Sequence, residues 1–542
     1  MKSVKILYVN PGKIDAGLDS VIKGPPLALL SIAAMVPEHD ATLFDFKVDR
    51  YDEEKFRKML RAHDITAITS MTPQISHALE VAEMAKQEGS TTIIGGYQPT
   101  LAPNSVIENS AVDFIVKGEG EHTFKELVDF LDPDHDNLQL AEIRGISYKD
   151  SADKIVHNAG RPLEPNLDNF PIPRRDLLRG KKYQYMGTRV NLMETSRGCP
   201  HNCSFCCIIK MWREPDDMPQ KMRYRTKSLR RIMEEVYSIY NLKGQSWDFI
   251  FFNDDNFTID VKRAKKIANL LIKSHMNENF YFSCQSRVDT LYKNPELAPL
   301  MAKAGFRNIF LGIESIHQQS LDAMNKHTTE EMIRTACKMC KDNQISVFAG
   351  MIIGYPGETK KMVRENIEFA IDLNPDFVQF TPITAFPGTD FFKQMEKEHK
   401  IATYDYKYYD LFHAMLRTEQ LTASQMYHLA AEAYVKFYLN VDYPKMMFNR
   451  VVKDGFTWML DMAFSWTKQF IFGGWDMFRS QGINNSLLEE DETLSSTDKK
   501  LRKNKKQSIR NRWREWLKFR KLLKKARKRE MKFEDPKLQR YS

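Results

Sequence analysis

Short apolar runs alternate with amphipathic segments along the first 131 residues of the chain. Runs such as VKILYV (4–9) and TTIIGG (91–96) have the length of buried strands, whereas residues 75–88 carry an apolar stripe at helical spacing. The expected strands are 4–9, 41–46, 67–70, 91–96 and 111–121, and the expected helices are 25–36, 53–62, 75–88 and 122–131. Strands that alternate with helices favour a parallel sheet covered on both faces. We therefore expect a doubly wound, Rossmann-like α/β domain over residues 1–135.

A second alternation of strands and helices begins near residue 191 and continues to about residue 400. The expected strands are 190–196, 248–254, 280–287, 306–315, 346–355 and 377–383, and the expected helices are 260–273, 295–304, 328–342 and 358–373. Six β/α units in about 200 residues predict an open, partial (β/α)6 barrel of the TIM type over residues 191–400. The acidic and Pro-rich stretches before it favour a linker with some extra strand over residues 136–190.

The pattern changes beyond residue 400, where Tyr, Phe, Met and Trp recur at helical spacing. We expect a helical C-terminal domain over residues 401–490 and a basic tail over residues 491–542. From Asp498 to Ser542 there are 20 Lys and Arg against 5 Asp and Glu, a net charge of +15. Because the whole chain carries +9, the remainder carries −6, so the body gives no electrostatic reason to bind nucleic acid.

Three cysteines stand in a Cys-x3-Cys-x2-Cys spacing directly after the first expected strand of the barrel. They are Cys199, Cys203 and Cys206, and Gly198 and Pro200 allow the tight loop that brings their sulfurs together. Thiolates are soft ligands that suit iron–sulfur clusters. Three cysteines on a cluster of four irons leave one iron free for the amine and carboxylate of S-adenosylmethionine (SAM). The spacing therefore predicts a catalytic [4Fe-4S] cluster.

Other assignments of the cysteines stay open at this stage. A structural zinc site usually needs four ligands, and His201 or Cys207 could supply the fourth. The remaining cysteines, Cys284, Cys337 and Cys340, are expected to be core or surface thiols.

The cysteine loop, with Phe205 before its last cysteine, resembles the signature loop of radical SAM enzymes. The resemblance implies that SAM lies across the strand ends that follow. The implied contacts are Asp254 and Asp255 near the methionine amine, Gln285 and Arg287 at the end of the third strand, where Arg287 could hold a carboxylate, Glu314 at the ribose, and Gly350 and Gly354 at the adenine. It also implies that the reduced cluster cleaves SAM to a 5′-deoxyadenosyl radical, which abstracts hydrogen from an unactivated carbon.

The first domain resembles the cobalamin-binding domain that precedes the barrel in one class of radical SAM enzymes. The matching text includes Thr69-Ser70-Met71-Thr72, Gly95-Gly96-Tyr97-Gln98-Pro99-Thr100 and Gly118-Glu119-Gly120-Glu121. The resemblance implies cobalamin contacts by Thr69, Ser70, Gly95, Gly96 and Gly118. An Asp-x-His-x-x-Gly motif is absent, and His39, His63 and His77 are expected at the surface. A domain that has lost its cofactor is the alternative.

Across residues 1–400 the chain resembles the cobalamin-dependent radical SAM class that includes hopanoid C-3 methylases and anaerobic magnesium-protoporphyrin monomethyl ester cyclases. The resemblance implies methyl transfer to an unactivated carbon of a lipid-like or tetrapyrrole-like small molecule, with ferredoxin or flavodoxin as reductant. An oxidative cyclase is the alternative within this class. A radical SAM enzyme that modifies tRNA, and a metal-binding protein without catalysis, are the alternatives outside it.

Cysteine usage and hydropathy bear on the compartment. Four of the seven cysteines fall within nine residues, which suits a metal site in a reducing compartment, and no signal peptide is evident. No run of about 18 apolar residues predicts a membrane-spanning helix. We expect a cytoplasmic protein without a nucleic-acid partner. Ile509, Trp513, Trp516 and Leu523, at helical spacing among Arg and Lys, predict a peripheral contact between the tail and an anionic membrane.

Overall fold

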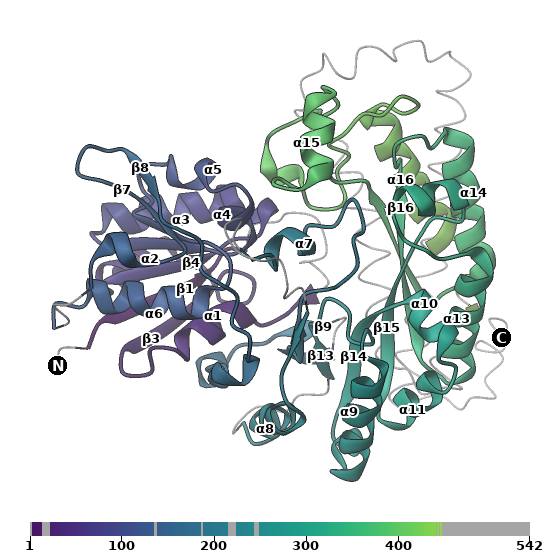
Figure 1. The fold of residues 1–542 in the computed structure, drawn as a ribbon, viewed down its shortest axis with the longest axis horizontal. Coiled ribbons are helices and arrows are strands. Elements are labelled where there is room, and N and C mark those ends of the chain that lie inside the picture. Colours follow the sequence, from purple (N-terminus) through teal and green to yellow (C-terminus); the bar gives the residue numbers. More distant parts are fainter. Residues whose placement is uncertain are drawn as a thin grey trace.

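The computed structural model describes residues 3–12, 22–134, 138–185, 188–214, 224–242, 249–440, 442, 443, 445 and 446. Two α/β domains stand side by side, the N-terminal one in purple to blue and the second in teal to green (Figure 1). The tail, with its Trp residues, and most of the expected C-terminal helical domain lie outside the described residues. Within the described part of the chain, no helix has the length and apolar character needed to cross a bilayer.

The N-terminal sheet confirms the expected doubly wound domain. Its parallel strands are β1 (Lys5–Asn10), β3 (Asp40–Asp45), β4 (Ile65–Thr69), β5 (Thr91–Gly95) and β6 (Phe114–Val116), in the order β3-β1-β4-β5-β6. Its main helices are α1 (Leu27–Ala33), α2 (Glu53–Arg61), α3 (Ile75–Gln87) and α6 (Gly120–Leu131). Side chains of β1 alternate between two cores: Ile6 and Tyr8 pack with α1 and α6, whereas Leu7 and Val9 pack with α2 and α3.

This sheet continues beyond residue 135, into the segment expected to be a linker with some extra strand. Strands β7 (Ile146–Lys149) and β8 (Ile155–His157), inside the expected linker, extend it antiparallel from β6. Phe114 and Tyr148 lie level across β6 and β7, with ring centroids 6.5 Å apart. In the other direction, β2 (Ile22–Lys23) leaves the first domain and pairs with β9 (Gln184–Tyr185) at the edge of the second sheet. Strands this short carry too few side chains to show a period in the sequence.

The second sheet confirms the partial barrel of six parallel strands. They are β10 (Thr188–Met193), β13 (Phe249–Phe252), β14 (Tyr281–Arg287), β15 (Phe306–Glu314), β16 (Ser346–Ile353) and β17 (Phe377–Pro382), each beside the next. The helices α9 (Val261–Lys273), α11 (Leu297–Lys303), α13 (Glu330–Asp342) and α14 (Lys360–Leu373) lie on the side of the sheet away from the N-terminal domain (Figure 1). Cys284 of β14 lies near Cys340 of α13, so it faces this helix-covered side. Because side chains alternate along a strand, Gln285 and Arg287 face the inside of the barrel.

Both edges of the barrel sheet are covered, which explains why it stops at six parallel strands. On one edge, β9 pairs antiparallel with β10, and β2 pairs antiparallel with β9. On the other edge, helix α16 (Ala423–Tyr438) lies along β17. The amide of Phe380 donates to the hydroxyl of Tyr434 at 3.0 Å, and the amide of Val378 donates to the hydroxyl of Tyr438 at 2.9 Å. Tyr434 and Tyr438 are four residues apart on a helix, and Val378 and Phe380 are two residues apart on a strand, and both separations span about 6 Å. The two hydroxyls therefore reach two successive outward-facing amides of β17, as a seventh strand would.

Candidate active site

The cysteine loop starts where β10 ends, at the carboxyl end of the barrel strands. A two-residue antiparallel pair closes its base: β11 (Ser196–Arg197) lies against β12 (Arg225–Thr226). Gly198 has a φ of +87°, in the left-handed region that glycine adopts without strain, and turns the chain into the loop. Cys199, Cys203 and Cys206 follow as half-buried free thiols. The loop thus presents three sulfurs from one short segment.

The spacing of these thiols disfavours the zinc alternative. Among the described residues, neither they nor Cys207 and His201 belong to a group of three donor atoms that all lie within 4.8 Å of one another. A tetrahedral zinc ion, with Zn–S bonds of about 2.3 Å, would bring its sulfurs to about 3.8 Å from one another. A cluster of four irons binds each cysteine through a different iron and needs them farther apart. The loop thus lacks, among its described residues, the close donor spacing of a preformed zinc site.

Burial makes two of the thiols in the loop harder to deprotonate. It raises the pKa of the Cys199 thiol and raises that of Cys206 well above its usual range. Thiolates bind metals, so these two side chains need a neighbouring positive charge, which a cluster iron supplies, to lose their protons.

Arg287, expected to hold a carboxylate, bonds to three groups of the chain in this structure. Its Nη1 donates to the Sγ of Cys203 at 3.6 Å. Its Nε donates to Asp289 at 2.9 Å, and its Nη2 donates to the carbonyl of Lys326 at 2.5 Å. Arg287 is 6% exposed, and each of its three guanidinium nitrogens has a partner in the chain. It therefore places a positive charge beside the Sγ of Cys203.

Asp254 and Asp255 hold the entrance of the cysteine loop. The buried carboxylate of Asp254 accepts hydrogen bonds from the amide of Thr195 at 3.0 Å, from its hydroxyl at 2.8 Å, and from the hydroxyl of Ser196. Asp255 accepts from the amide of Gly198 at 2.9 Å, and burial raises the pKa of its carboxyl to about 7. Both residues thus bond to the start of the loop that carries the cysteines, a role in shaping the loop that the sequence did not indicate.

Glu314 also has a partner within the protein. It ends β15 with a φ of +68°, and its carboxylate accepts from the Nζ of Lys326 at 2.6 Å. Gln285, half-buried, lies level with Phe310 inside the barrel. Both residues therefore lie where a ligand in the barrel would pass, with Glu314 already neutralised.

The two glycines expected at the adenine are required by packing. A Cβ at Gly350 would lie 2.7 Å from the ring of Phe310, and a Cβ at Gly354 would lie 2.7 Å from the Sδ of Met426. Gly354 also has a φ of +77°. Phe205 packs against the main core from within the cysteine loop. These contacts account for the glycines without a ligand.

A cavity of about 550 Å³ opens beside Cys203 and Cys206. Tyr355, at the end of β16, and Phe391 stack in its wall with ring centroids 6.0 Å apart. The hydroxyl of Tyr355 lies 2.9 Å from that of Ser204, which ties this wall to the cysteine loop. The cavity thus offers aromatic faces next to two of the three thiols.

The residues expected to contact cobalamin lie together at the carboxyl edge of the N-terminal sheet. Ser70 donates its amide to the carbonyl of Gly95 at 2.8 Å, directly after Thr69 ends β4. Gly96 has a φ of +111°, and a Cβ there would lie 2.7 Å from the carbonyl oxygen of Ser70. The space beside Gly118, whose φ is +73°, is open. Half-buried glycine backbone, with open space beside Gly118, suits the close approach of a ligand.

Two histidines expected at the surface are buried. They are His39 and His77, and His77 accepts a hydrogen bond from the amide of Gly12 at 3.2 Å. His39 forms, with Glu38 and Asp129, the one group of three potential metal ligands among the described residues. Its Nδ1 accepts from the amide of Val4 at 3.2 Å, so the proton of the neutral ring lies on Nε2. Neither ring nitrogen then has a free lone pair, which excludes a metal there.

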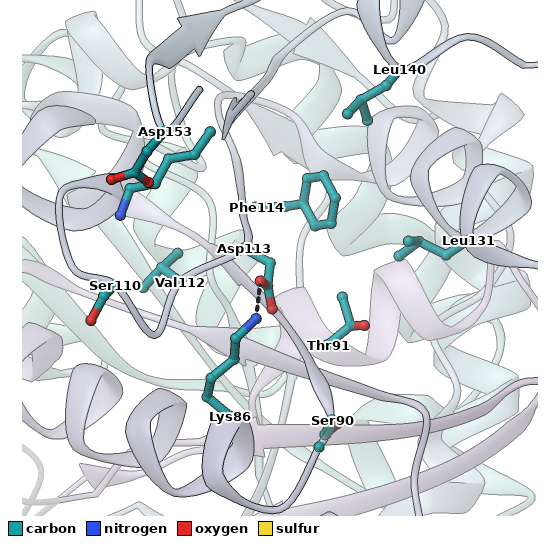
Figure 2. A pocket seen from close by; sticks show the side chains of 12 residues that line it. Lys86, Ser90, Thr91, Ser110, Val112, Asp113, Phe114, Leu131, Leu140 and Asp153 are labelled. Carbon is teal, nitrogen blue, oxygen red and sulfur yellow. Dashed lines mark hydrogen bonds and ion pairs between the residues drawn. The ribbon is translucent and has the colours of Figure 1, made fainter. Parts of the chain in front are cut away.

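A second cavity, of about 450 Å³, lies at the opposite edge of the N-terminal sheet, where β5 and β6 begin (Figure 2). Figure 2 shows Lys86 paired with Asp113 in its wall. Lys149 donates to the carbonyls of Glu108 and Asn109. Because its cations are already bonded and the cysteines are at the other edge, this cavity is no candidate for a cofactor.

Sequence reasoning missed the residues that join the two domains at this site. Tyr97, in α4 (Tyr97–Leu101), reaches from the N-terminal domain toward the cysteine loop. Burial, with the nearby charges of Asp255, Cys207 and Cys206, raises its pKa well above the usual range. Helix α4 also contacts α7 (Ile208–Met211), which follows the last cysteines and lies between the domains in Figure 1.

Arg197, Glu119 and Glu121 were also missed, although they stand inside the two matching motifs. Arg197 donates to Glu119 at 2.8 Å and to Glu121 at 2.6 Å. Nothing in a single sequence indicates that residues this far apart form ion pairs. Only the adjacency of charged residues to the motif glycines and cysteines could have pointed to them.

Known proteins resemble both domains. Residues 193–370 match the radical SAM superfamily, and residues 17–128 match the B12 binding domain. An uncharacterized methyltransferase of Pyrococcus horikoshii is 33% identical over 455 residues, which cover 82% of this chain and 94% of that protein. The anaerobic magnesium-protoporphyrin IX monomethyl ester cyclase of Cereibacter sphaeroides is 26% identical, over 80% of this chain and 70% of its own.

Solved structures show the same fold. The cobalamin-dependent SAM radical enzyme OxsB, with aqua-cobalamin and SAM bound, matches with a TM-score of 0.65 at 17% identity, covering 100% of this chain and 83% of that one. The radical SAM methyltransferase TsrM of Kitasatospora setae, with cobalamin and a [4Fe-4S] cluster bound, matches with a TM-score of 0.59 at 18% identity, covering 73% and 78%. The chain is an enzyme of the cobalamin-binding radical SAM family, whose cofactors are a [4Fe-4S] cluster, SAM and cobalamin.

Proposed function

We propose that the protein is a methyltransferase that adds a methyl group to an unactivated carbon of a small lipid-like or tetrapyrrole-like molecule. The observation that carries the proposal is the contact between α4 and α7. It brings the glycine-rich edge proposed for cobalamin next to the thiols proposed for the cluster. The P. horikoshii relative, named a methyltransferase and matched over 94% of its length, supports the same class of reaction.

The residues of this chain have distinct parts in that reaction. When bound, the cluster and SAM supply a 5′-deoxyadenosyl radical for hydrogen abstraction, and cobalamin supplies the methyl group. Cys199, Cys203 and Cys206 would each hold one iron. The cavity beside Cys203 and Cys206 has room for the nucleoside of SAM, with the aromatic wall of Tyr355 and Phe391 against its base. A one-electron donor such as ferredoxin or flavodoxin would reduce the cluster.

The inside of the barrel favours an apolar substrate with at least one polar group. Gly312 and Gly350 lie level on neighbouring strands, and the ring of Phe310 fills the space that a side chain at Gly350 would take. Phe310 provides a half-buried ring beside them, and Gln285 provides an amide level with that ring. Ligand sites combine apolar walls with a few polar groups that fix orientation, and this interior has both.

The proposal is tested with anaerobically purified protein, loaded with cluster and cobalamin. The protein is incubated with SAM that carries a deuterated methyl group, a chemical reductant, and either a lipid or a tetrapyrrole extract of the source organism. Mass spectrometry should find 5′-deoxyadenosine and one apolar compound that gains a single trideuteromethyl group. A compound that loses hydrogen without gaining label would instead identify an oxidative cyclase.

A triple variant provides the negative control. Cys199→Ala, Cys203→Ala and Cys206→Ala together should abolish both products, whereas Cys337→Ala, which removes a buried thiol outside the loop, should keep them. A triple variant that still cleaves SAM, or a wild-type protein that takes up no corrinoid at full iron loading, would overturn the proposal.

The membrane contact of the tail belongs to the same proposal. A segment with a net charge of +15 and interspersed Trp suits an anionic surface. Deletion of residues 498–542 should abolish co-sedimentation with vesicles that contain phosphatidylglycerol and leave the low binding to phosphatidylcholine unchanged. If the deletion instead abolishes binding to tRNA and the intact protein ignores vesicles, the tail is an RNA-binding segment.

A further inference from the structure

Two arginines face each other at the base of the cysteine loop. Arg197 of β11 is the direct cross-strand partner of Arg225 of β12. Both are nearly buried, with exposed fractions of 6% and 5%. Like charges on directly opposed residues of an antiparallel pair repel each other, and burial strengthens the repulsion. The base of the loop is therefore unstable unless carboxylates neutralise it.

Two of the neutralising carboxylates come from the other domain. Glu119 Oε1 lies 2.8 Å from the Nη1 of Arg197 and 2.8 Å from the Nη1 of Arg225, so it bridges the two arginines. Glu121 Oε1 accepts from the Nη2 of Arg197 at 2.6 Å. The third, Glu194 at the end of β10, is bonded to Arg197 at 2.8 Å. The N-terminal domain thus supplies both the bridge and one further charge.

Arg225 depends on Glu119 more than Arg197 does. The Nη1 of Arg225 binds Glu119 and the carbonyl of Glu164 at 2.7 Å. Its Nε and Nη2 are buried without a hydrogen-bond partner among the described residues. Arg197 has three carboxylates, and its guanidinium also lies 4.9 Å from the ring centroid of Phe170. Removal of one partner from a buried ion pair leaves an uncompensated charge, which is strongly unfavourable.

The same residues adjoin both cofactor sites. Arg197 stands two residues before Cys199, and Glu119 directly follows Gly118 at the open edge proposed for cobalamin. Displacement of the Gly118–Glu121 turn would leave the two arginines without these carboxylates. Opening of the cysteine loop would leave Glu119 and Glu121 without the arginines. One buried charge network therefore requires both loops to be in place together.

We propose that this network of Glu119, Arg197 and Arg225 couples the binding of the cluster to the binding of cobalamin. Each cofactor orders one of the two loops and thereby favours the arrangement that the other cofactor needs. The three are positioning residues, since none of them contacts the cysteine sulfurs. The inference rests on the proposed function in that the chain binds both cofactors.

The experiment measures the affinity of the full-length protein for hydroxocobalamin, with and without the reconstituted cluster, by anaerobic absorbance titration. Wild-type protein should bind hydroxocobalamin at least about fivefold more tightly when the cluster is present, the lower end of typical coupling between sites. Glu119→Gln keeps the shape but removes the bridging charge, and should bring this ratio close to one. Glu126→Gln is the matched control, because Glu126 lies on the same helix and pairs with Arg161 of its own domain.

If Glu119 had a purely structural role, Glu119→Gln would weaken hydroxocobalamin binding equally with and without the cluster. The ratio of the two affinities would then stay as in wild type, which would overturn the inference. A ratio of one in wild-type protein would overturn it without any variant. If Glu119→Gln does not fold, Glu121→Gln takes its place, and it should lower the ratio. Failure of wild-type protein to bind hydroxocobalamin in either state would instead refute the proposed function.

Discussion

The hydroxyl of Tyr438 forms both backbone hydrogen bonds of Val378, accepting from its amide at 2.9 Å and donating to its carbonyl at 2.8 Å. A neighbouring strand would form the same two bonds. Tyr434 meets Phe380 two residues further along β17. A row of tyrosines on one helix thus satisfies the edge of the barrel and removes a template for pairing with another chain.

Tyr438→Phe should destabilise the protein by about 2 kcal/mol, because it leaves a buried amide and a buried carbonyl without partners. Tyr240→Phe, at a residue that is 50% exposed, should stay within about 0.5 kcal/mol of wild type. Unfolding in urea, followed by circular dichroism, measures both. Equal effects of the two substitutions would show that the hydroxyl of Tyr438 does not hold the edge.

Arg287→Gln should lower the reduction potential of the cluster. It removes a positive charge and a donor 3.6 Å from Cys203, and both stabilise the reduced, more negative cluster. An interaction of about 1.4 kcal/mol corresponds to roughly 60 mV in a one-electron couple. A redox titration followed by electron paramagnetic resonance gives the value. Arg307→Gln, at the opposite end of the barrel strands, should leave the potential unchanged.

Gly96→Ala should cost more stability than Gly89→Ala, although both glycines have positive φ. Gly89 has no atom within 4 Å of a new Cβ, so the change there costs only the backbone strain of about 1 to 2 kcal/mol. At Gly96 the new Cβ also meets the backbone of Ser70, and the total should reach about 3 kcal/mol or more. Thermal unfolding compares the variants. Similar losses of stability in the two variants would show that the backbone at Ser70 moves away from residue 96 at little cost.

Glu235 should give the protein part of its stability above pH 4.5. Burial alone would raise its pKa, but the charges of Lys227, at 2.8 Å, and Arg175, at 2.6 Å, outweigh it and lower the pKa to about 2 from a usual value of 4.5. The unfolded chain therefore takes up a proton first as the pH falls, and stability is lost between pH 4.5 and 2. The shift corresponds to about 3 kcal/mol.

Glu235→Gln tests this contribution. The variant should be less stable than wild type at pH 7, and the difference should shrink as the pH approaches 2. Glu234→Gln, on the same helix and 42% exposed, should show neither effect. Denaturant titrations at several pH values measure the difference. A gap that stays constant with pH would contradict the low pKa.

The sequence predicted the elements that are long enough to carry a period. The strands that became β14, β15 and β16 span seven to nine residues and were expected almost to the residue. The cysteine loop was equally clear, because its chemistry is local. By contrast, β2, β9, β11 and β12 have two residues each, and their pairing depends on partners far along the chain.

Roles that depend on contacts between distant residues could not be predicted. Arg287 was expected to bind a carboxylate, and only the fold shows that Asp289, Lys326 and Cys203 already occupy it. The aromatic residues beyond 400 indicated a helix, which α16 confirms. No local pattern indicated that two of its tyrosine hydroxyls would bond to β17.

The contact between η2 (Thr72–Gln74) and η7 (Tyr406–Tyr408) has a consequence for synthesis on the ribosome. The sheet of the first domain is complete at β8, whereas η7 emerges roughly 250 residues later, or roughly 10 to 50 s at common rates of translation. A Cβ at Gly388 would lie 2.7 Å from the carbonyl of Leu101, so a second late segment also packs against this domain. The parts of the nascent first domain that η7 and the segment around Gly388 contact therefore stay uncovered while most of the barrel is being made.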